Sequence, residues 1–132
     1  MELFDLAFYM ERVIPKLNKG LVESLWLIIP AALIGGSFGI FMGVLRVFGT
    51  KWIKKTADTF VAVIRGVPLT IQLMILYFGL PYLPFIKIYL TPYQAALIGF
   101  IFCTGAYQSE YIRGALLSIK QGQIKAGQAL GM

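Results

Sequence analysis

The chain has 132 residues, of which 58% are hydrophobic and 14% are charged, and its formal net charge is +6. So little polar surface cannot cover a soluble domain of this size, and the composition therefore predicts an integral membrane protein. Because there is no histidine and Cys103 is the single cysteine, a disulfide within the chain and histidine-based catalysis are excluded, and a zinc site is disfavoured. We therefore expect no catalytic residue, no metal site and no cofactor.

Residues 1–19 predict an amphipathic helix. Apolar side chains recur at three- and four-residue steps from Leu3 to Leu17, while the charged side chains fall on other faces. A helix of this kind lies on a membrane surface, and this one carries too many charges to cross. Pro15 and Gly20 predict an elbow between it and the first crossing.

Three long stretches contain no Asp, Glu, Lys or Arg, and they have 22, 21 and 22 residues. Each is long enough for a helix to cross a hydrocarbon core of about 30 Å, which takes about 20 residues. The sequence therefore predicts an all-helical protein with three transmembrane helices, over residues 21–47, 59–81 and 90–113.

The first predicted crossing has a stripe of small residues. Ala31, Gly35, Gly39 and Gly43 recur every four residues and so form one bare helical face. Such a face allows a second helix to approach closely. That helix can belong to another subunit or to the same chain, and both alternatives stay open. Pro30 lies inside the run, where it can kink the helix.

The basic residues flank the apolar stretches, without the interleaved aromatic residues of a nucleic-acid surface, so we expect no nucleic-acid partner. Three crossings divide these residues into four on one side and eight on the other. The first group is Arg12, Lys16, Lys19 and Lys87; the second is Arg46, Lys51, Lys54, Lys55, Arg65, Arg113, Lys120 and Lys125. The positive-inside rule places the larger group in the cytoplasm and the N-terminus outside. Residues 49–55 are then a short basic connection on the cytoplasmic side.

The second predicted crossing contains a helix break. Arg65 would lie roughly 9 Å inside it at 1.5 Å per residue. Pro68 removes a backbone donor, and Gly66 relieves crowding. Backbone groups freed inside a membrane need protein or a water-filled cavity around them, which indicates a transport pathway, with the Gln72 amide on the same face as Pro68. The alternative is an arginine that reaches the interface beside a structural proline.

The end of the third predicted crossing is polar on one side. The residues on this side follow three- and four-residue spacing, which predicts a face turned towards protein. They are Ala106, Ser109, Glu110, Arg113 and Gly114, with Tyr107 on the face of Glu110. Glu110 and Arg113 are three residues apart and can pair. A structural ion pair and a substrate or gating role are both open for them.

Residues 119–132 predict a short cytoplasmic helix. Two turns fit between Gln123 and Leu130, and Gly131 is a natural helix stop. Gly127 within these turns costs about 1 kcal/mol relative to alanine, so the helix is marginal alone and needs a partner surface.

Three of these segments together resemble the permease subunits of bacterial ABC importers, specifically the polar amino acid uptake family. Residues 65–72 resemble the family's Arg-Gly-Thr-Pro-Leu-x-x-Gln segment, and residues 105–114 its Ala-Tyr-x-x-Glu-x-x-Arg-Gly segment. Gly-Gln at 122–123 and Ala-Leu-Gly-Met at 129–132 resemble the ends of its coupling loop. Family members continue into two further spans, about five in all, so the chain resembles the N-terminal part of a five-span permease core.

The resemblance implies partners and roles. A second permease subunit, identical or different, would complete the pathway in the bacterial cytoplasmic membrane among its lipids. A cytoplasmic ATP-binding subunit would hydrolyse ATP, and an outer binding protein would deliver the amino acid. By matching motif, the substrate or pathway residues would be Pro68, Leu69, Gln72, Tyr107 and Glu110, the structural or gating residues Arg65, Gly66, Ser109, Arg113 and Gly114, and the ATPase-coupling residues Gly122, Gln123, Ala126 and Gly131.

Two other hypotheses fit the residues. A small ion-coupled exporter would use Glu110 as a proton-linked carboxylate. An inactive permease fragment would transport nothing.

Overall fold

The computed structural model describes residues 8–84 and 87–131, and every element within them is helical. In chain order the elements are a π-helical turn (Tyr9–Val13), α2 (Ile14–Phe48), α3 (Lys51–Gly66), α4 (Leu69–Met74), a second π-helical turn (Ile75–Gly79), a 3-10 turn (Leu80–Tyr82), α5 (Pro92–Ser118) and α6 (Gln121–Ala129). The all-helical prediction is thereby confirmed for the described residues.

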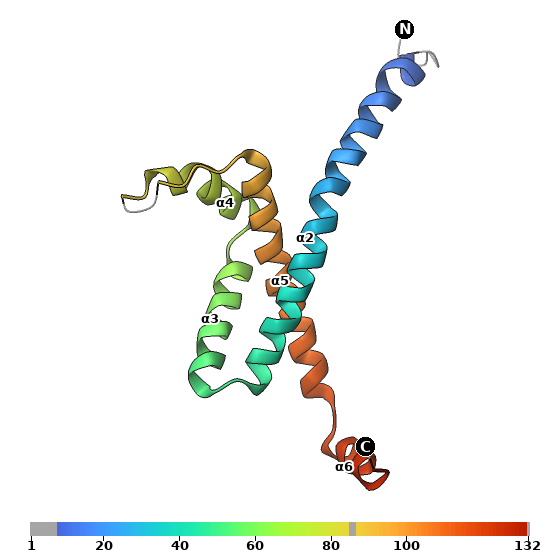
Figure 1. Cartoon of the computed structure of the whole chain (residues 1–132), viewed down its shortest axis with the longest axis vertical. Coiled ribbons are helices and arrows are strands. Elements are labelled where there is room, and N and C mark those ends of the chain that lie inside the picture. Colours follow the sequence, from blue (N-terminus) through green and yellow to red (C-terminus); the bar gives the residue numbers. More distant parts are fainter. Residues whose placement is uncertain (1–7, 85–86, 132) are drawn as a thin grey trace.

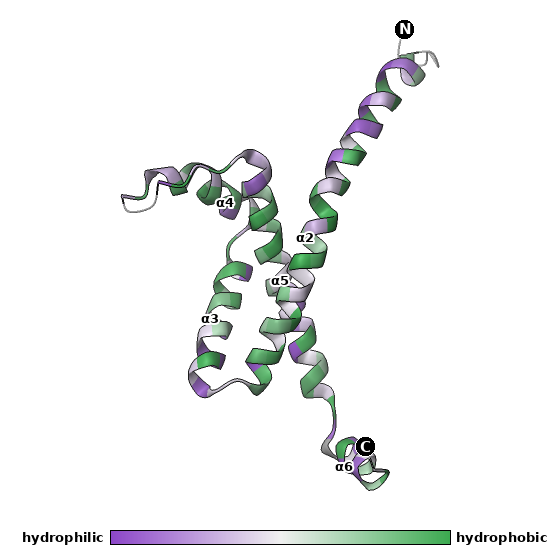
Figure 2. Ribbon diagram, viewed as in Figure 1, coloured by the Kyte–Doolittle hydropathy of each residue, from purple (hydrophilic) through white to green (hydrophobic). Residues whose placement is uncertain are grey.

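The two long helices, α2 and α5, cross each other, and α3 runs beside them (Figure 1). Helix α4 and the turns after it leave this bundle sideways, and α6 lies apart at the other end (Figure 1). Apolar residues dominate the middle of α2, whereas polar residues gather towards its N-terminal end (Figure 2). The described residues therefore form a small helical bundle, from which the N-terminal part of α2, the segment around α4 and helix α6 project (Figure 1).

The predicted elbow at Pro15 and Gly20 is wrong. Helix α2 continues through both residues, and with the π-helical turn before it forms one helix from Tyr9 to Phe48. Pro15 lies at the junction between the π-helical turn and α2, and its fixed φ angle of about −65° is compatible with both. The predicted surface helix thus continues directly into the first crossing, and its residues 1–7 lie outside the described residues.

Helix α2 also continues through Pro30, and a neighbouring helix supplies the missing hydrogen bond. Proline has no N–H to give to the carbonyl four residues earlier, here Trp26. The Tyr93 hydroxyl of α5 donates to that carbonyl oxygen at 2.9 Å. The freed backbone group is thus satisfied by another helix of the same chain, as an apolar environment requires.

The stripe of small residues on α2 packs against α5 of the same chain. A Cβ atom added at Gly39 would lie 2.5 Å from the Cβ atom of Gln108, and one at Gly43 would lie 2.7 Å from that of Ile112. On the facing helix, a Cβ atom at Gly105 would lie 2.5 Å from the ring of Phe38. Of the two open alternatives, the structure therefore shows packing within one chain. We call this contact the glycine seam.

Helix α3 joins the bundle through apolar side chains. Ala57 and Val61 of α3 are buried with Met42 of α2 and Ala106 of α5. Beside them, Phe38, Phe60 and Phe102, one from each helix, meet edge to face with ring centroids 5.9 to 6.0 Å apart. The core therefore lies where the three helices meet.

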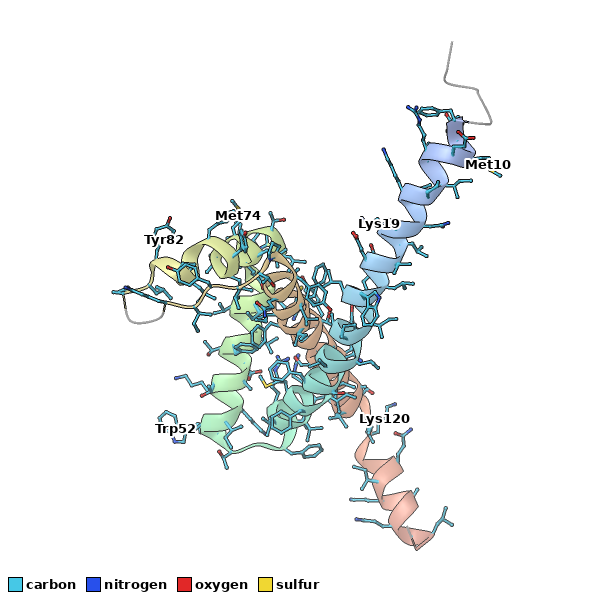
Figure 3. The ribbon with its side chains drawn as sticks, turned by 45° about the horizontal axis from the view of Figure 1, so that its top comes forward. Met10, Lys19, Trp52, Met74, Tyr82 and Lys120 are labelled. Carbon is cyan, nitrogen blue, oxygen red and sulfur yellow. The ribbon has the colours of Figure 1, made fainter. Side chains whose placement is uncertain are left out.

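The predicted basic connection over residues 49–55 is mostly helical. Helix α3 begins at Lys51, ahead of the predicted start of the second crossing at residue 59, so the link from α2 is Gly49 and Thr50 alone. Trp52 in its first turn is 79% exposed and points away from the bundle (Figure 3). An exposed tryptophan beside lysines suits a membrane interface.

Among the described residues, the helix from Tyr9 to Phe48 is long and apolar enough to cross a membrane. Helix α3 together with residues 69–82 also qualifies, as a pair bent by 100°. Helix α5 is not among these candidates, because glutamine, tyrosine and other polar residues lower its hydropathy. The number of crossings therefore stays a prediction.

Candidate functional site at a broken helix and an arginine cluster

The chain breaks between α3 and α4, where the sequence predicts it. Val67 and Pro68 have extended backbones, with ψ angles of 127° and 138°, and the helices on either side are bent by 100°. Proline disfavours a helical conformation in the residue before it, and this explains the position of the break. A Cβ atom at Gly66 would meet nothing within 4 Å, so the expected relief of crowding by Gly66 is wrong.

Gln72 bridges the break. Its side-chain nitrogen Nε2 donates to the carbonyl oxygens of Ile64 at 2.7 Å and of Val67 at 2.8 Å. These carbonyls lie at the end of α3, where a helix leaves its last acceptors without partners. Gln72 also borders an apolar pocket of about 290 Å³ between Phe60 and Leu76. Its amide nitrogen therefore holds the bend together at the edge of this pocket.

At the end of α3 that precedes the break, side chains from three helices form what we call the arginine cluster. Its members are Arg46 of α2, Asp58 and Arg65 of α3, and Ser109, Glu110 and Arg113 of α5. Three guanidinium groups meet the Glu110 carboxylate. Arg46 Nη2 lies 2.9 Å and Arg65 Nη1 3.2 Å from Oε2, and Arg113 Nη2 lies 2.5 Å from Oε1. The predicted Glu110–Arg113 pair is thus present, within a larger network.

Ser109 lies beneath this network and is fully buried. Its hydroxyl donates to the Ala106 carbonyl oxygen at 2.9 Å and accepts from Arg46 Nη1 at 3.1 Å. A buried hydroxyl needs such partners, because a buried polar group without a hydrogen bond would cost about 1–3 kcal/mol of stability. Ser109 therefore supports the cluster from within.

Arg65 has two partners on α5. Besides its contact with Glu110, its guanidinium lies over the Tyr107 ring, 5.2 Å from the centroid. Arg65 is the residue directly before Gly66, the last residue of α3. The end of the broken helix is therefore held against α5 by one side chain, through an ion pair and a cation–π contact.

The structure divides the predicted pathway residues into two groups. Tyr107 and Glu110 meet Arg65, whereas Pro68, Leu69 and Gln72 lie at or beyond the bend. Helix α4 packs on α5 near Gly99, where an added Cβ atom would lie 2.5 Å from Leu73. Gly99 precedes Glu110 by about three helical turns, or roughly 16 Å at 1.5 Å per residue.

Gly114, one of the predicted structural or gating residues, lies apart from these contacts. A Cβ atom added there would meet nothing within 4 Å.

The predicted coupling residues lie on or directly after α6. Gly122, Gln123 and Ala126 are within this helix, which makes no contact with the other described helices. Gly131 follows it with a φ angle of +81°, and its N–H donates to the Gln128 carbonyl oxygen at 3.1 Å. The predicted helix stop at Gly131 is confirmed, because this left-handed conformation favours glycine.

Sequence reasoning missed two members of the cluster. It counted Arg46 as a cytoplasmic charge and gave Asp58 no role. A signal for Arg46 exists, since it lies three residues after Gly43 and so continues the glycine stripe that faces α5. Asp58 is the one acidic residue between Lys51 and Arg65, next to the buried Ala57.

A bundle of apolar helices with a broken helix beside buried charges is typical of a membrane transport component. Residues 35–132 match the model of the family described as binding-protein-dependent transport system inner membrane component. The chain belongs to this family. It is therefore an inner membrane component of a bacterial transport system, of the permease type.

Individual relatives agree with this assignment. The chain is 38% identical over 119 residues to the glutamine transport system permease protein GlnP of Escherichia coli K12, covering 90% of this chain and 54% of the relative. It is 35% identical over 119 residues to the arginine transport system permease protein ArtQ of Bacillus subtilis, covering 90% and 53%. A crystal structure of an amino acid ABC transporter with histidines superposes with a TM-score of 0.82 and 30% identity, over 95% of this chain and 57% of that chain. The chain spans about half the length of the curated relatives it matches.

Proposed function

We propose that this chain is a permease component of an ATP-driven importer that moves polar amino acids across the bacterial inner membrane. The observation that carries the proposal is the break between α3 and α4, whose end is tied to α5 by Arg65 beside Tyr107 and Glu110. Relatives at 38% and 35% identity are permeases for glutamine and arginine, both polar amino acids.

The partners follow from the proposal. A separate cytoplasmic subunit hydrolyses ATP, an outer binding protein delivers the amino acid, and a second permease subunit completes the pathway. The N-terminus lies outside, as the excess of lysine and arginine on the other side indicates. Helix α6 then lies in the cytoplasm, free of the bundle and available to the ATPase.

Within the site, Glu110 and Tyr107 are our candidates for substrate contact, together with Pro68, Leu69 and Gln72 at the bend. Arg65, Gly66, Ser109, Arg113 and Gly114 are structural or gating residues. An ion-coupled exporter is the weaker hypothesis, because guanidinium groups already occupy both oxygens of Glu110.

The coupling role of α6 can be tested by co-purification of the full-length permease with its ATPase. Gly131→Arg forces a side chain into a φ angle of +81° and should disrupt the end of α6, so it should lose the ATPase. A chain cut after Ser118 should lose it as well. The matched control is Gly20→Arg, at another glycine where an added Cβ atom meets nothing within 4 Å. Equal recovery of the ATPase by all of these proteins would contradict the coupling role.

A further inference from the structure

Arg46 is the most buried cation of the arginine cluster. Its side chain is 7% exposed, compared with 39% for Arg65 and 36% for Arg113. A buried charge is tolerated when it is paired and its hydrogen bonds are satisfied. All three guanidinium nitrogens of Arg46 have a partner, so this condition is met.

These partners come from two other helices. Nε lies 2.6 Å from Asp58 Oδ1 of α3, Nη1 donates to Ser109 Oγ of α5 at 3.1 Å, and Nη2 lies 2.9 Å from Glu110 Oε2. One rigid guanidinium therefore joins α2 to α3 and to α5. Arginine suits this task because its planar fork has donors in fixed directions, which lysine lacks.

Arg46 and Arg65 share one oxygen atom, Glu110 Oε2. Arg65 carries the end of α3 at the break, and its side chain is half-exposed. Arg46 holds the same oxygen from the buried side and has two further partners. Arg113 of the same helix α5 holds the other oxygen, Oε1. From outside α5, Arg46 is therefore the residue that holds Oε2 where Arg65 meets it.

We propose that Arg46 is a positioning residue for transport, which fixes the Glu110 carboxylate and thereby sets the position of the broken end of α3 against α2 and α5. The inference rests on the proposed function as an importer. Arg46 acts through Glu110, so its contribution to transport depends on the presence of that carboxylate.

A double-mutant cycle on transport tests this dependence. The full-length permease is reconstituted in proteoliposomes with its ATPase and binding protein, and ATP-driven uptake of radiolabelled L-glutamine and L-arginine is measured per assembled complex. We expect Arg46→Met and Glu110→Gln each to lower the maximal rate about tenfold, and the double variant to match the slower single variant within about twofold. The binding-protein concentration for half-maximal uptake should not change. Independent losses, which would multiply to about a hundredfold, would overturn the proposal.

Two further variants control for folding. Lys19→Met removes the exposed Lys19–Glu23 pair of the same helix, where the atoms are 4.0 Å apart, and should transport like wild type. Arg46→Lys keeps the charge but cannot reach all three partners, so an assembled complex should retain an intermediate rate. A wild-type rate for Arg46→Lys would overturn the proposal.

A structural measurement separates this inference from the proposed function. Spin labels at the exposed positions Lys55 and Leu117, in a Cys103→Ser background, report the distance between α3 and α5. The distance distribution should broaden in Arg46→Met and stay narrow in Lys19→Met. If wild type transports neither amino acid, the proposed function fails. The distance measurement still tests whether Arg46 positions α3 against α5. An unchanged distribution in Arg46→Met would overturn the inference.

Discussion

The glycine seam and the arginine cluster both join α2 to α5, but they do so by different physical means. At the seam, Gly39 and Gly43 allow the helices to touch without any charge. At the cluster, Arg46 joins them through charged hydrogen bonds that also include α3. Close packing depends on the shapes of the two helices, whereas the ion pairs depend on charge and on the directions of the donor groups. We therefore expect the seam to contribute most to stability and the cluster to determine the position of the broken helix.

The largest effect on stability is expected at the seam. Gly39→Leu would place a Cβ atom 2.5 Å from Gln108 and force the helices apart. We expect a loss of about 3 kcal/mol, at the upper end for overpacking, measured as thermal unfolding in detergent. Gly36→Leu is the matched control, because an added Cβ atom there meets nothing within 4 Å. Equal losses at both positions would show that the seam is not a close contact.

The next largest effect is expected at the bend. Gln72→Leu removes two hydrogen bonds, to Ile64 and Val67, and leaves carbonyl groups at the end of α3 without these donors. The expected cost is about 2 kcal/mol, visible as faster hydrogen exchange at the amides of residues 64–67 and 69–72. Thr70→Val on the exposed side of α4 should leave exchange unchanged. Protection equal to wild type in Gln72→Leu would exclude the bridging role.

A smaller effect is expected where Tyr93 compensates for Pro30. Tyr93→Phe removes the hydrogen bond to the Trp26 carbonyl oxygen and should cost about 1 kcal/mol. In a Pro30→Ala background the backbone N–H of residue 30 can serve this carbonyl, so Tyr93→Phe should cost less than half as much. Unfolding curves of the four proteins give both numbers. The same cost in both backgrounds would mean that Tyr93 does not compensate for the proline.

The smallest effect is expected at the exposed pair on α2. Lys19 and Glu23 are 81% and 71% exposed, with their charged atoms 4.0 Å apart. Glu23→Gln should change stability by less than about 0.5 kcal/mol, because water and salt screen such pairs. The same assay applied to Glu110→Gln should give a clearly larger loss. Similar losses would remove the distinction between exposed ion pairs and the cluster.

The sequence predicts those features that depend on neighbouring residues. The break follows from Pro68, the helix stop follows from Gly131, and the Glu110–Arg113 pair follows from helical spacing. Contacts between helices are harder to predict. The role of Arg46 depends on Asp58 of α3 and Glu110 of α5, which contact Arg46 only when the three helices pack together.

Two errors have a local physical cause. Pro15 was expected to bend the chain, but it lies at the junction between the π-helical turn and α2, where the fixed φ angle of proline is compatible with the helix. The lysines after Thr50 were expected in a connection, yet lysine is a good helix former and α3 includes them. The sequence could not decide whether the glycine stripe packs within the chain or against another subunit, because small residues have the same spacing in both kinds of contact.

The most direct test of the proposed importer is uptake by proteoliposomes that contain the full-length permease, its ATPase and the binding protein. Our account predicts that L-glutamine or L-arginine accumulates inside only when ATP is supplied at the ATPase and the binding protein is present on the opposite side. Collapse of a proton gradient should leave this uptake unchanged. Transport by the permease alone that follows a proton gradient and is lost in Glu110→Gln would contradict the account.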